Sequence, residues 1–99
     1  MKYATIQRPS EGTLQIMRRK AFDPTLRKKL EEHVEAVGIC QGSVMEILVA
    51  SDVAEKAAGV ASGEINGSCP QHMTCLIVVG DTGSVRAAME AVKESMQTL

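Results

Sequence analysis

The apolar run Val44–Ala50 can form either a buried strand or a helix, and the residues around it decide between the two. Ser43 with Glu46 three residues later forms a capping box, and Gly59 is the residue type at which helices commonly end. Apolar residues then fall mostly on one helical face, as expected for a face that packs on a core: Val44, Ile47, Leu48, Ala54, Ala57 and Ala58. The sequence therefore predicts a helix from about Val44 to Ala58.

Two further elements are predicted before this helix. Tyr3–Gln7 is a short run of β-forming residues, and Pro9 soon after it removes a hydrogen-bond donor, so we expect an edge strand. Asp23-Pro24 supplies a helix N-cap followed by proline at the first helical position, and apolar residues recur every four residues behind it. This pattern predicts a helix from about Pro24 to His33.

The remaining part of the chain adds two strands and a helix. Val60–Ile65 is predicted as a weak strand and Met73–Val79 as a strong apolar strand. Gly80–Ser84 is then a strand-to-helix turn, and the helix after it is expected to be capped by Thr82 or Ser84. Together the elements predict an α/β (α+β) fold: one domain over residues 1–99, with about four mainly antiparallel strands flanked by helices.

Composition excludes several classes of function. Aromatic residues make up only 2% of the chain and the net charge is −1, so neither stacking platforms nor a basic field for nucleic acid is present. The three cysteines are an odd number and no signal-peptide pattern precedes them, so we expect a reduced, cytoplasmic setting. No apolar run approaches the roughly 20 residues of a membrane span, so we expect a soluble protein.

One thiol stands apart from the predicted core. Cys69 lies in a turn-like segment where glycine, serine and proline favour an exposed loop, whereas Cys40 and Cys75 lie in apolar segments and are expected to be small core residues. The cysteine spacing fits no metal site within one chain. A thiol enzyme using Cys69 and His72 is a weaker alternative, because the sequence offers no recognisable third group to orient the histidine.

Two motifs resemble those of a known family. Ala50–Val60 and, about twenty residues later, Val79–Ala88 resemble the corresponding motifs of bacterial microcompartment shell proteins, and the spacing between them is also similar. A strand like Ala36–Ile39 precedes them in that family. Members of the usual order finish with a segment that Ile6–Glu11 resembles, here placed at the front. The chain therefore looks like a circularly permuted BMC domain, most similar to the type from glycyl-radical propanediol microcompartments.

The resemblance implies a structural protein rather than an enzyme. Such proteins form flat homohexamers that tile with neighbouring shell proteins into a cytoplasmic polyhedral shell, with a pore on the six-fold axis. Lys56 falls on the family's edge lysine, and Arg8 falls on the arginine of its edge segment, so both are candidates for contact between hexamers. Encapsulated enzymes or redox partners are the other partners that the resemblance implies.

The predicted pore-lining loop contains the exposed thiol. In this family the loop between the last two central strands lines the pore, and here it comprises Gly67, Ser68, Cys69, Pro70, Gln71 and His72. A six-fold axis would bring six Cys69 thiols together, a soft-ligand set suited to a [4Fe–4S] cluster shared between subunits. The alternative is a metal-free pore for small metabolites, in which Ser68, Gln71 and His72 set the polarity of the opening.

Overall fold

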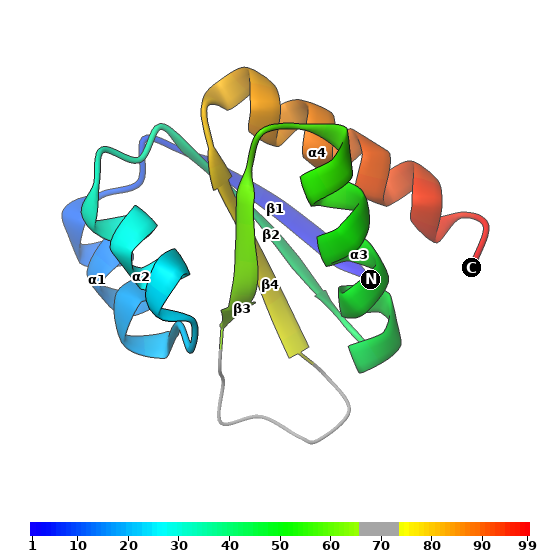
Figure 1. Ribbon diagram of the computed structural model, residues 1–99, viewed down its shortest axis with the longest axis horizontal. Coiled ribbons are helices and arrows are strands. Elements are labelled where there is room, and N and C mark those ends of the chain that lie inside the picture. Colours follow the sequence, from blue (N-terminus) through cyan, green and yellow to red (C-terminus); the bar gives the residue numbers. More distant parts are fainter. Residues whose placement is uncertain (66–73) are drawn as a thin grey trace.

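A four-stranded antiparallel sheet with the strand order β1-β2-β4-β3 organises the fold (Figure 1). The computed structural model describes residues 1–65 and 74–99, and within these ranges four helices accompany the sheet. Along the chain the elements are β1 (Lys2–Gln7), α1 (Glu11–Lys20), α2 (Pro24–Glu31), β2 (Ala36–Gly42), α3 (Val44–Ala57), β3 (Ala61–Ile65), β4 (Thr74–Gly80) and α4 (Thr82–Met96). The predicted fold class and the predicted edge strand are confirmed.

Helices cover both faces of the sheet. Figure 1 shows α1 and α2 on one side of the strands and α3 and α4 on the other. Because side chains alternate along a strand, β4 contributes to both layers: Leu76 and Val78 pack with α3 and α4, while Ile77 and Val79 pack with α1 and α2. This double burial explains why β4 is a nearly continuous apolar run.

The capping signals that predicted α2 and α3 are present. The Ser43 hydroxyl oxygen accepts the Glu46 N–H at 3.2 Å, and the Glu46 carboxylate accepts the Ser43 N–H at 2.9 Å, which completes the capping box of α3. The Asp23 carboxylate accepts the Thr25 N–H at 3.3 Å at the start of α2. This helix ends at Glu31, two residues before the predicted end.

The cap of α4 differs from the prediction. Neither Thr82 nor Ser84 is the N-cap; Asp81 is, and its carboxylate accepts the Ser84 N–H at 2.8 Å. An aspartate directly before the first helical turn satisfies a free N–H and places negative charge at the positive end of the helix dipole. The carboxylate of Glu35 also accepts the Thr82 N–H at 3.0 Å.

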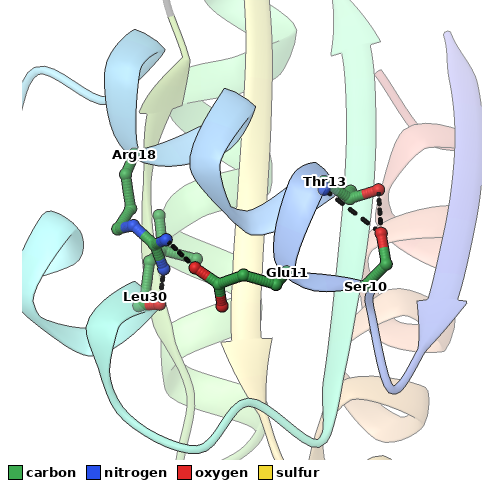
Figure 2. A network of polar contacts seen from close by, with 5 residues as sticks. All are labelled: Ser10, Glu11, Thr13, Arg18 and Leu30. Atoms are coloured by element: carbon green, nitrogen blue, oxygen red, sulfur yellow. Dashed lines mark hydrogen bonds and ion pairs between the residues drawn. The ribbon is translucent and has the colours of Figure 1, made fainter.

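Helix α1 was not anticipated from the sequence. Ser10 is its N-cap and accepts the Thr13 N–H, while Arg18 near its end forms an ion pair with Glu11 (Figure 2). The Arg18 guanidinium also donates to the Leu30 carbonyl oxygen at 2.8 Å, which satisfies a carbonyl at the end of α2. These contacts hold α1 against α2 on one face of the sheet.

The two edges of the sheet are β1 and β3. An isolated bridge between Ala21 and Ile65 covers one end of β3. Within residues 1–65 and 74–99, no helix combines the length and the apolar character required to cross a bilayer.

Candidate functional site

The predicted pore loop connects β3 to β4 at one end of the sheet. Strand β3 ends at Ile65 and β4 begins at Thr74, and these two ends are adjacent because Ile65 pairs with Cys75. The predicted pore residues themselves lie outside the described residues, so their role stays a prediction: Gly67, Ser68, Cys69, Pro70, Gln71 and His72.

The strands on either side of this loop are joined by a polar contact. The Thr74 hydroxyl donates to the Glu64 carboxylate, which links the end of β3 to the start of β4. Cys75 follows in β4, pairs across the sheet with Gln41 and is partly buried. The structure therefore fixes the points at which the chain leaves and re-enters the sheet.

The two described thiols are poorly suited to act as ligands or nucleophiles. Burial raises the pKa of the Cys40 thiol to about 11, with a smaller contribution from Cys75, and its sulfur lies 3.9 Å from the Met89 sulfur. Burial likewise raises the pKa of Cys75. Because the thiolate is the reactive and ligating form, burial disfavours reaction and metal binding at both cysteines.

The described part of one chain offers no ready-made metal centre. Among residues 1–65 and 74–99, no group of three or more histidine, cysteine, aspartate or glutamate side chains is arranged to hold a metal ion.

The predicted edge residue Arg8 lies at the opposite end of the sheet. It follows the last residue of β1, and its backbone N–H donates to the Glu35 carbonyl oxygen at 2.7 Å, just before β2 begins. Its φ of 48° is in the left-handed region, which is unfavourable for a residue with a side chain and uncommon before a proline. Strained backbone of this kind often occurs at functional positions.

Lys56 lies toward the same end, in the last turn of α3. Its ammonium group is 2.8 Å from the Asp52 carboxylate, and both side chains are well exposed, at 77% and 61%. Helix α3 begins at the end of the sheet where β2 finishes. It runs to the opposite end of the sheet, where β3 starts at Ala61 (Figure 1). The structure thus places Lys56 and Arg8 at one end of the sheet and the connection between β3 and β4 at the other.

A cavity of about 520 Å³ with a mixed polar and apolar lining occupies the end that carries Lys56 and Arg8. Its lining includes His33, Glu35 and Asp81, none of which the sequence marked as a site residue. The carboxylates of Glu35 and Asp81 accept backbone N–H groups at the start of α4, and the hydrogen bonds from Ser84 lower the pKa of Asp81. These acids therefore have a structural role in capping α4.

Helix α3 buries only part of the face that the sequence pattern suggested. The buried residues are Ile47, Ala50 and Ala54, whereas Val44 and Leu48 are 54% and 68% exposed. Both lie beside β3, where a groove of about 200 Å³ separates the helix from the strand. An apolar helical face that stays exposed is a candidate contact surface.

Comparisons with known proteins agree with the two motifs. Residues 36–99 match the family model described as the BMC domain. The ligand-free structure of the GrpU microcompartment shell protein from Clostridiales bacterium 1_7_47FAA is similar with a TM-score of 0.74 and 34% identity, over 98% of this chain and 93% of that chain. The ligand-free GrpU shell protein from Pectobacterium wasabiae has a TM-score of 0.72 and 27% identity, over 93% and 99%.

A third solved structure shares the fold. It is described as the fused permuted hexameric shell protein MSM0275 from the RMM microcompartment, and it covers 97% of this chain and 45% of its own length with a TM-score of 0.73 and 24% identity. No curated protein matches the sequence significantly.

Proposed function

Because this chain belongs to the BMC-domain family and is a structural protein of a bacterial microcompartment shell, we propose that it acts as a homohexameric tile with a central pore. Similarity over nearly the whole chain to a permuted shell protein, and a family match that begins only at β2, support circular permutation with β1 placed in front. In this proposal residues 66–73 surround the pore, and Lys56 and Arg8 meet neighbouring tiles.

The observation that carries this proposal is the separation of the two predicted sites. A tile with a pore at its centre and neighbours at its rim needs one end of each subunit at the axis and the other outside. Strand β3 ends and β4 begins at one end of the sheet, on either side of residues 66–73 in the sequence, while Arg8 and Lys56 lie toward the other end. The strands would then run outward from the pore.

We further propose that Cys69 from several subunits holds a [4Fe–4S] cluster in the pore. The donor chemistry fits, because Cys69 is the one cysteine that the sequence places in a turn-like segment, whereas burial raises the pKa of the Cys40 and Cys75 thiols. Four thiolates cannot obey six-fold symmetry, so a subset of the six subunits would supply the ligands. When bound, such a cluster supplies one-electron transfer.

The ring is tested by the mass of the protein in solution. Light scattering of wild-type protein should give six times the mass of the 10.6 kDa chain. A monomer would contradict the tile and would revive the thiol enzyme that uses Cys69 and His72.

The cluster is tested separately on anaerobically reconstituted rings. Iron and sulfide should be bound in equal amounts, close to four of each per six chains, with thiolate-to-iron absorption in the visible range. Cys69→Ser should abolish both signals, while the matched control Cys75→Ala should keep them because Cys75 lies in the sheet, where burial raises the pKa of its thiol. Rings without iron, or Cys69→Ser rings that keep it, would favour a metal-free metabolite pore.

A further inference from the structure

One flank of the molecule presents apolar side chains to solvent. Val44, Met45 and Leu48 at the start of α3 are 54%, 60% and 68% exposed, although a helix of this pattern would normally bury such residues. Val44 and Leu48 border a groove against β3 and the start of β4, defined here as the α3 groove. Its lining is mainly apolar and small: Val44, Ile47, Leu48, Gly63, Glu64 and Thr74.

The opposite flank also has a groove. Strand β1 is the other edge of the sheet, and Thr5 and Gln7 are exposed on the side toward α4. Between this strand and the helix lies a groove of about 270 Å³, defined here as the β1 groove. Its lining is Thr5, Gln7, Arg86, Met89, Glu90 and Lys93. The flank at β3 therefore presents exposed side chains of α3, and the flank at β1 presents an exposed edge strand.

The charges of the two grooves are also complementary. Among the described residues that line the α3 groove, Glu64 is the only charged one. The β1 groove has two cations, Arg86 and Lys93, against the single carboxylate of Glu90. The Lys93 ammonium group lies 5.4 Å from the Tyr3 ring centre, so it is held over β1. Contact between unlike flanks would be attractive, whereas contact between two β1 grooves would bring like charges together.

We propose that the start of α3 in one copy docks in the β1 groove of the next copy, with Leu48 as the central apolar anchor. This contact is heterologous, because two different surfaces of the chain meet, and repeated contacts of this kind give a ring when the rotation between copies closes. Both grooves lie on the sheet face that carries α3 and α4, so successive copies keep the same face on the same side. The inference rests on the proposed ring and identifies the surfaces that build it.

Single-flank variants test this contact. Leu48→Asp should convert the ring to monomers at a protein concentration where the wild type is fully assembled, because it places a charge in the apolar contact. The double variant Arg86→Glu with Lys93→Glu should do the same from the other flank. Ile16→Asp is the matched control, since Ile16 is 47% exposed on a helix of the other sheet face, and it should leave the ring intact.

Mixing the two interface variants gives the sharpest result. Each keeps one intact flank, so a one-to-one mixture should form dimers and nothing larger, as measured by native mass spectrometry. Circular dichroism and thermal melting should show that every variant is folded, and Leu48→Ser replaces Leu48→Asp if the latter is not. A wild-type ring that survives the Leu48 substitution, or a mixture that stays monomeric, overturns this inference alone. A monomeric wild type instead overturns the proposed tile.

Discussion

Replacing Arg8 by glycine should make the protein more stable while removing the contact between tiles that we propose for its side chain. An L-residue in the left-handed region costs about 1–2 kcal/mol, and the φ of Arg8 is 48°. Glycine removes that cost but loses about 0.5–1 kcal/mol through the greater freedom of the unfolded chain. The net expectation is a gain of about 0.5–1 kcal/mol. The hydrogen bond to the Glu35 carbonyl should persist, because it uses the backbone N–H.

The assay compares Arg8→Gly with Arg8→Ala at one fixed chain concentration, since assembly shifts the apparent stability. For a domain of this size, each kcal/mol moves the melting temperature by roughly 4–8 °C, so Arg8→Gly should melt roughly 2–8 °C above wild type. Arg8→Ala keeps the strained φ and should melt close to wild type. Both should lose the side-chain contact between rings, seen as fewer extended sheets by electron microscopy. A glycine variant that melts no higher than the alanine variant would refute the strain argument.

Two further predictions concern charge. Lys56→Ala should reduce the assembly of rings into extended layers without dissolving the rings. Because its ion pair with Asp52 is exposed, thermal melting should show a change in stability below about 0.5 kcal/mol. The control Lys28→Ala should leave the extended layers unaffected. For Cys40, burial raises the folded-state pKa from 9.0 to about 11, so the folded state keeps a proton that the unfolded state loses. Stability should fall as the pH rises between these values, and urea titrations in reducing buffer should show a weaker fall for Cys40→Ala.

Local signals in the sequence were sufficient for most of the fold. The capping box at Ser43 and the Asp23-Pro24 start are interactions among neighbouring residues, so they identify α3 and α2 without knowledge of the rest of the chain. Helix α1 carries comparable signals, with Ser10 as its cap and basic residues in its last turn, and they could have revealed it. Its short apolar stripe, with only Leu14 and Met17 buried, is a weak periodic signal beside its charged residues.

The candidate site was less accessible from the sequence, because its residues meet only through tertiary structure. Pairing of β1 with β2 brings Arg8 against Glu35, and no local pattern predicts the positive φ that results. The capping of α4 by Glu35, 47 residues away in sequence, is equally non-local. The predicted role of Cys69 depends on symmetry between chains, which neither the sequence nor a single copy contains.

The apolar face of α3 shows how an assembly can be encoded in one chain. The periodic pattern placed Val44 and Leu48 on the face that packs on the core, but the fold of one copy leaves both exposed. Apolar side chains that one copy leaves exposed can be buried when copies assemble. A group of them on one surface therefore indicates a contact site for a partner. If the α3 and β1 grooves close the ring, the same contact that buries Leu48 would bring the Cys69 thiols together. Cluster binding should then be lost in Leu48→Asp although every cysteine is present.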